Sequence, residues 1–129
     1  MLGDSPSGLQ YTDMITFIVN NLNKISVFGL ILLAAASVIF GDFAAKLWST
    51  NHNNNWYTLA LGGYFLSGVF YIPTLLREGL VITSILWSVL SIIGFLAIGL
   101  IIFRESVSNL QILGILFGVV SIVILTMVE

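Results

Sequence analysis

Four long apolar runs with almost no charges constrain the fold of this chain more than any other feature. They are Ile25–Trp48, Trp56–Leu76, Leu80–Phe103 and Leu110–Val128. A helix needs about 20 predominantly apolar residues to cross the hydrocarbon core of a bilayer. Of the 129 residues, 58% are hydrophobic and 8% are charged, whereas soluble domains carry about 25% charged residues. We therefore predict an all-α integral membrane protein.

The connections between these runs are short, which predicts antiparallel neighbours. They are Ser49–Asn55, Arg77–Gly79 and Arg104–Asn109. Helices joined in this way form an up-and-down four-helix bundle. We expect residues 25–129 to be one transmembrane domain that crosses the cell (inner) membrane several times, with the lipid bilayer as its surroundings.

Residues 1–24 are more polar and precede the first run. Met1–Gly8 has the composition of a disordered lead. Beyond it, apolar side chains recur with helical spacing at Tyr11, Met14, Ile15, Ile18 and Leu22. This segment is too short and too polar to span a bilayer, so we predict a short amphipathic helix that lies in the membrane interface. A frayed tail is the alternative.

The basic residues are divided evenly between the two predicted sides of the membrane. Lys24 and Arg77 fall on one side, and Lys46 and Arg104 on the other. This balance gives no positive-inside bias. Insertion in both orientations would allow an antiparallel homodimer about an axis in the membrane plane. The alternative is a single orientation set by one charge near the amphipathic helix.

The last run carries a pattern typical of helix association. Gly114 and Gly118 form a G-x-x-x-G match, and Ser121 extends the small face. Small residues let helices approach closely in lipid. We predict that this face is a dimerisation surface, with packing inside the chain as the alternative.

Asp42 and Lys46 are ionisable residues within the first apolar run. Ionisable side chains in a membrane span are costly and are functional candidates by default. On a helix, residues four apart share a face and can pair. Asp42 is therefore either a group that exchanges a proton or cation with the substrate, or one half of a structural ion pair. Lys46 is also near enough to the end of the run to reach the interface.

Two seams of polar and aromatic residues follow the second and third runs. The second run carries tyrosines at heptad spacing with a neighbouring serine, and the third carries three serines beside a tryptophan. The residues are Tyr57, Tyr64, Ser67, Tyr71, Ser84, Trp87, Ser88 and Ser91. Together with Asp42 they could line one cavity for a cationic or amphipathic molecule, because aromatic faces and carboxylates both attract cations. Alternatively, the seams only join helices through hydrogen bonds.

Several functional classes have no support in the sequence. The chain has no cysteine and a net charge of only −2, so we expect neither thiol chemistry nor nucleic-acid binding. No metal-ligand cluster, nucleophile–base pair or phosphate-binding loop is visible. We expect no enzyme activity, no cofactor and no metal. The Arg77–Glu78 and Arg104–Glu105 steps and His52 are expected to be solvated surface groups.

The chain resembles the small multidrug resistance transporters of the drug/metabolite transporter superfamily from about Leu30 to Leu125. The matching positions are Gly41, Lys46, Tyr64, Trp87–Ser88, Phe103 and Gly114, with Ser121 in place of the second glycine of that family's dimerisation motif. The resemblance implies a dual-topology homodimer that exchanges protons for a cationic substrate. The family's essential glutamate falls at Val38, and the nearest acid is Asp42, one turn further on. The glycines that kink the family's third span fall at Val89 and Ser91, which moves the expected bend to Gly94.

The string Gly41-Asp42-Phe-Ala-Ala-Lys46 is also similar to the small flippase subunits that move aminoarabinose-linked undecaprenyl phosphate. That resemblance implies that Lys46 meets a lipid phosphate. Our principal prediction is a small secondary transporter, coupled to protons, whose site comprises Asp42, Lys46, Tyr64, Ser84, Trp87 and Ser88. The alternatives are a flippase-type carrier of a lipid-linked substrate, or a non-transporting subunit of a larger membrane complex that docks through the N-terminal helix.

Overall fold

The computed structural model describes residues 6–127, and in this part of the chain all regular structure is helical. The helices are α1 (Pro6–Leu22), α2 (Val27–Asn51), α3 (Asn54–Tyr71), α4 (Leu80–Ala97) and α5 (Asn109–Met127). A 3₁₀ turn, η2 (Ile72–Leu76), continues α3, and a π-helical turn, η3 (Ile98–Ile102), continues α4. The predicted all-α class is confirmed.

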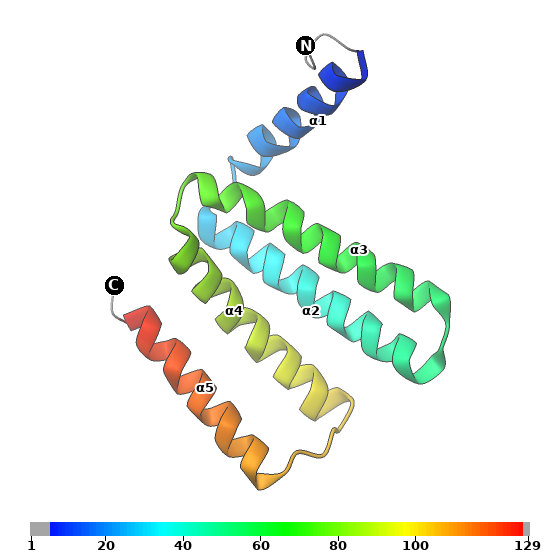
Figure 1. Ribbon diagram of the computed structural model, residues 1–129, viewed down its shortest axis with the longest axis vertical. Coiled ribbons are helices and arrows are strands. Elements are labelled where there is room, and N and C mark those ends of the chain that lie inside the picture. The colour runs from blue at the N-terminus through cyan, green and yellow to red at the C-terminus, as the bar shows by residue number, and fades with distance from the viewer. Residues whose placement is uncertain (1–5, 128–129) are drawn as a thin grey trace.

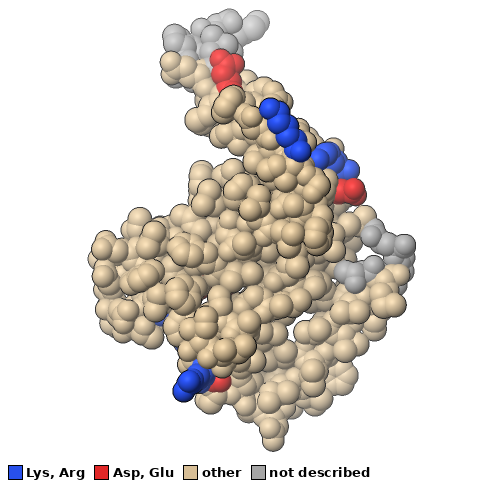
Figure 2. Space-filling view, turned by 180° about the vertical axis from the view of Figure 1, so that it is seen from behind, with Lys and Arg blue, Asp and Glu red and all other residues tan. Residues whose placement is uncertain are grey.

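Three helical segments are long and apolar enough to cross a membrane. They are Val27–Asn51, Asn54–Leu76 and Leu80–Ile102, while α5 contributes a shorter apolar helix. On the face shown in Figure 2, the charged side chains lie in an upper group and a lower group, with a broad uncharged surface between them. This distribution matches a bilayer, in which the uncharged band faces hydrocarbon and the charges face the interfaces. These features indicate a membrane protein.

The helices lie side by side in the order α3, α2, α4, α5 (Figure 1). The buried residues of α2 are mainly small or aliphatic, and include Leu30, Ile31, Ala34, Ala35 and Ala44. Helix α2 packs against both α3 and α4, so the buried core lies along α2. Helix α5 packs on α4 at the edge, where most of its residues are exposed. The described chain is therefore an up-and-down row of helices with α5 outermost.

Two glycines allow α2 and α3 to pack closely. A Cβ atom at Gly63 would lie 2.8 Å from the backbone nitrogen of Gly41 and 2.9 Å from the carbonyl oxygen of Ser37. Lipid does not drive helices together by hydrophobicity, so close van der Waals contact between small residues is what holds such a pair. The backbones meet where the sequence supplies glycine on both helices.

Capping residues make the α2–α3 connection shorter than the predicted Ser49–Asn55. Helix α2 continues to Asn51, and His52 ends it in the left-handed conformation with φ 53°, donating its N–H to the Trp48 carbonyl. Asn53 then caps α3 by accepting a hydrogen bond from the backbone N–H of Asn55. Asparagine favours helix N-caps because its side-chain oxygen satisfies an unpaired N–H group.

Helix α1 begins earlier than the amino-acid pattern predicts. The expected disordered lead, Met1–Gly8, is wrong for residues 6–8, which are helical, while residues 1–5 lie outside the described part. Proline suits the first turn of a helix because its φ is already near the helical value. Helix α1 extends away from the other helices (Figure 1), with Tyr11 and Phe17 exposed. Its location in a membrane interface stays a prediction.

Candidate functional site

A cavity of about 420 Å³ lies between α2, α3 and α4. This volume is within the range of small-molecule sites, which occupy about 300–1,000 Å³. Its lining comes from one residue of α2, four of α3 and three of α4: Val38, Tyr64, Ser67, Gly68, Tyr71, Ser84, Trp87 and Ser88.

The structure brings together four of the six residues proposed for a substrate or ion site. Tyr64, Ser84, Trp87 and Ser88 all line the cavity, and the seam residues Ser67 and Tyr71 join them. Two other seam residues lie elsewhere. Tyr57 packs against Trp48, with ring centroids 5.2 Å apart, and Ser91 is buried and donates to the carbonyl of Trp87.

Hydrogen bonds hold the polar groups of the cavity lining in place. The hydroxyls of Tyr71 and Ser84 lie 2.6 Å apart. Trp87 directs its indole N–H to the Ser67 hydroxyl at 3.4 Å, and that hydroxyl donates to the carbonyl of Ala34 at 2.8 Å. The Tyr71 and Trp87 rings are also neighbours, with centroids 5.8 Å apart. The aromatic side of the cavity is therefore ordered by contacts within the protein.

Asp42 is joined to this cavity through Tyr64. The Tyr64 hydroxyl donates to Asp42 Oδ1 at 2.8 Å. Gly41 makes room for the tyrosine ring, because a Cβ at Gly41 would lie 2.7 Å from Tyr64 Cε1. A hydrogen bond from a phenol to a carboxylate is charge-assisted and fixes the orientation of the two groups. The half-buried Asp42 carboxylate thus lies one side chain away from the cavity.

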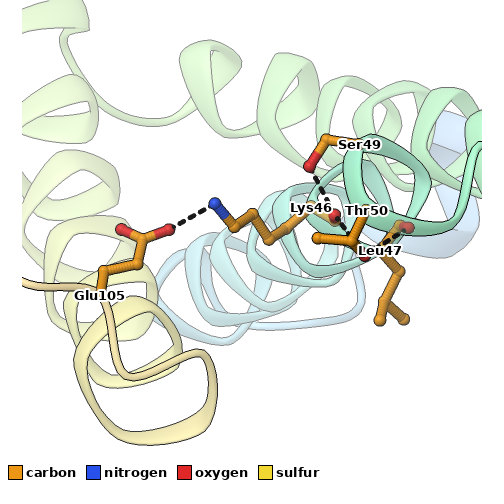
Figure 3. A network of polar contacts seen from close by, with 5 residues as sticks. All are labelled: Lys46, Leu47, Ser49, Thr50 and Glu105. Atoms are coloured by element: carbon orange, nitrogen blue, oxygen red, sulfur yellow. Dashed lines mark hydrogen bonds and ion pairs between the residues drawn. The ribbon is translucent and has the colours of Figure 1, made fainter.

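Lys46 pairs with Glu105 and, among the described residues, does not pair with Asp42. The Lys46 Nζ and Glu105 Oε1 atoms are 2.8 Å apart, and 41% and 48% of the two side chains are exposed. Figure 3 shows Glu105 reaching α2 from the chain that follows α4. Glu105 is exposed, as expected of an end charge, and the structure adds that it forms an ion pair. The structure places Asp42 with Tyr64 and Lys46 with Glu105, in two separate contacts.

Two short polar side chains bond to backbone carbonyls near the end of α2. Ser49 Oγ donates to the carbonyl of Lys46 at 2.7 Å, and Thr50 Oγ1 donates to that of Leu47 at 3.0 Å (Figure 3). Such bonds add a second donor to carbonyls near the end of the helix. Lys46 extends toward Glu105 from this part of α2.

The small face of α5 is open within one copy of the chain. Cβ atoms built at Gly114 or Gly118 would meet no other atom within 4 Å, and Ser121 is exposed. The alternative interpretation, that these glycines serve packing inside the chain, finds no contact in the described structure.

Within residues 6–127, no three side chains of the metal-binding types lie close enough to hold a metal ion. Comparison with known protein families, curated protein sequences and solved structures finds no match to this chain. Its function is therefore inferred from the cavity and the side chains around it.

Proposed function

We propose that this protein is a small membrane transporter that carries a cationic or amphipathic molecule through the cavity between α2, α3 and α4. The observation that carries this proposal is the cavity itself. Its aromatic and hydroxyl lining lies among three helices of membrane-spanning length. Such a lining suits a molecule with an apolar body and a positive group, because aromatic faces attract cations.

The recognition chemistry follows from the Tyr64–Asp42 contact. Tyr64 lines the cavity and its hydroxyl holds Asp42 Oδ1 at 2.8 Å. A cation that enters next to Tyr64 gains the attraction of the ring and of the carboxylate behind it. Asp42 is the proposed coupling group, which exchanges a proton for the cation that occupies the cavity.

A homodimer in the inner membrane belongs to the same proposal. The open small face of Gly114 and Gly118 supports it, because a second copy would cover that face. The even division of Lys24, Lys46, Arg77 and Arg104 between the two ends supports insertion in both orientations. Both features accord with the resemblance to the small multidrug resistance transporters.

The contact made by Lys46 favours the drug-type transporter over the flippase-type carrier. In the flippase alternative, Lys46 would meet a lipid phosphate. Glu105 already neutralises Lys46 at 2.8 Å, so a phosphate would have to displace a carboxylate. The remaining alternative, a subunit of a larger complex, would use the exposed face of α1, which includes Tyr11 and Phe17.

Transport by reconstituted protein tests the proposal. Proteoliposomes would be loaded with a fluorescent lipophilic cation, and its movement followed with and without a pH gradient. Ser88→Trp places an indole in the cavity, whereas the matched control Ile93→Trp places it on an exposed part of α4. The indole would occupy space that the cation needs, so Ser88→Trp should slow transport about tenfold or more, which corresponds to about 1.4 kcal/mol. Equal rates in the two variants would overturn the cavity as the route.

Labelling from each side of intact membranes tests orientation. The chain has no cysteine, so Asn55→Cys in the exposed first turn of α3 would be its only thiol. Comparable labelling from both sides supports the antiparallel homodimer. Labelling from one side alone would exclude it and leave a parallel assembly or a subunit.

A further inference from the structure

Two side-chain pairs tie the end of α4 to α2, near the α2–α3 connection. The rings of Phe43 and Phe103 have centroids 5.7 Å apart. The Lys46 Nζ atom lies 2.8 Å from Glu105 Oε1. Phe43 and Lys46 are three residues apart and therefore share one face of α2. An aromatic contact and an ion pair thus act on the same short stretch of chain.

The backbone of this stretch is irregular, and its irregularity positions both partners. The α-helix gives way at Ile98 to a π-helical turn, and the N–H of Phe103 donates to the Ile98 carbonyl. Arg104 then adopts a left-handed conformation with φ 51°, and the N–H of Glu105 returns to the carbonyl of Gly99 at 2.9 Å. π-Helical turns are rare and occur often at functional sites.

Two glycines, Gly94 in α4 and Gly99 in the π-helical turn, leave space for the side chains that lie against them. A Cβ at Gly99 would lie 3.4 Å from Glu105 Oε2, so the carboxylate rests against that glycine. Nearer the cavity, the side chain of Ile39 occupies the space where Gly94 lacks a Cβ. Ile39 directly follows Val38, which lines the cavity. The α2–α4 contact therefore begins beside the cavity and runs to the ion pair.

We propose that Phe43–Phe103 and Lys46–Glu105 form a latch that closes the cavity toward the α2–α3 connection, with the π-helical turn as its hinge. This inference rests on the proposed function, because it assigns a gate to the same cavity. An ion pair that is nearly half exposed contributes little stability, so it can open at small cost. Release of the latch would separate α4 from α2 at Ile39 and admit water there.

Thiol labelling at Ile39 tests the latch directly. Ile39→Cys would be the only thiol in the chain, and because Ile39 packs against Gly94, it should react faster with a maleimide when the α2–α4 contact opens. Nanodiscs expose both faces of the membrane, so the rate does not depend on orientation. In this background, Glu105→Gln and Lys46→Gln should each raise the labelling rate about threefold to fivefold. The charge-swapped pair Lys46→Glu with Glu105→Lys should return it to within about twofold of the parent.

Glu78→Gln provides the matched control. Glu78 is exposed and belongs to the Arg–Glu step at the other end of the molecule, so its neutralisation should leave the labelling rate unchanged. Unchanged rates in both latch variants, the same rise in Glu78→Gln, or a swapped pair as fast as the single variants would overturn the latch. A wild-type protein that moves no cation would instead overturn the proposed function, while the labelling rates would still decide whether the latch exists.

Discussion

Tyr64 on α3 donates a hydrogen bond to Asp42 on α2, with 2.8 Å between the two oxygen atoms. The contact joins residues 22 positions apart in the chain. Asp42 is the one acidic residue of α2, and Tyr64 is part of the cavity lining. Tyr64 therefore has two roles: its ring faces the cavity, and its hydroxyl orients the carboxylate behind it.

Removal of the Tyr64 hydroxyl should weaken cation binding without unfolding the protein. Tyr64→Phe keeps the ring but deprives Asp42 of its donor. Hydrogen bonds to charged groups contribute about 1.5–3 kcal/mol, so the dissociation constant of a fluorescent lipophilic cation should rise about tenfold. Fluorescence titration in detergent micelles measures this constant.

Tyr57→Phe is the control for that variant. Tyr57 lies on the same helix and in the same heptad register, but it packs against Trp48 outside the cavity. The dissociation constant of the cation should be the same for Tyr57→Phe as for the parent protein. If the two variants bind the cation equally well, the Tyr64–Asp42 contact takes no part in recognition.

Neutralisation of Asp42 should abolish coupling while preserving the geometry. The amide oxygen of Asp42→Asn can still accept from Tyr64, so only the charge is lost. A carboxylate about 6 Å from a bound cation contributes roughly 3 kcal/mol at an effective dielectric constant of about 20. Cation affinity should fall at least about tenfold, and a pH gradient should no longer drive uptake into proteoliposomes. Asp13→Asn on the exposed part of α1 is the control, and uptake unaffected by Asp42→Asn would remove Asp42 from the mechanism.

Periodic features within a single helix were predictable from the sequence. The heptad tyrosines and the serines at i and i+4 identified Tyr64, Tyr71, Ser84 and Ser88, all of which line the cavity. Their spacing places them on one face of each helix, and two polar faces in an apolar protein tend to meet.

Contacts between distant segments were not predictable in the same way. Glu105 lies 59 residues beyond Lys46, and it reaches Lys46 only because the chain turns through a π-helical segment and a left-handed residue. Local spacing favoured Asp42 as the partner, since residues four apart share a helix face. Likewise, the adjacent glycines Gly62 and Gly63 look alike in the sequence, and only the α2–α3 packing distinguishes them.

A bulky residue on the open face of α5 should weaken dimers without harm to the single chain. Gly118→Leu adds a side chain where no atom lies within 4 Å, so α4–α5 packing is undisturbed. Loss of close helix contact should raise the dimer dissociation constant about tenfold, as measured by energy transfer between labelled copies in micelles. Val120→Leu, two residues and roughly 200° around the helix, should have no such effect. Equal dimerisation in both variants would show that this face of α5 is not the interface.

The two adjacent glycines of α3 should respond in opposite ways to the same substitution. In Gly63→Ala the new methyl group would lie 2.8 Å from the Gly41 nitrogen and 2.9 Å from the Ser37 carbonyl oxygen. Both neighbours are backbone atoms of α2, so the helices must separate, and overpacking of this kind costs about 1–3 kcal/mol. In Gly62→Ala the methyl group meets nothing within 4 Å, and alanine in a helix is favoured over glycine by about 0.5–1 kcal/mol.

Reversible unfolding in mixed micelles should therefore show a lower free energy of unfolding for Gly63→Ala and an equal or higher one for Gly62→Ala. Because both variants add one methyl group to the same turn of α3, a difference between them reports the α2–α3 contact alone, and equal stability would mean that the two helices do not meet at Gly41 and Gly63.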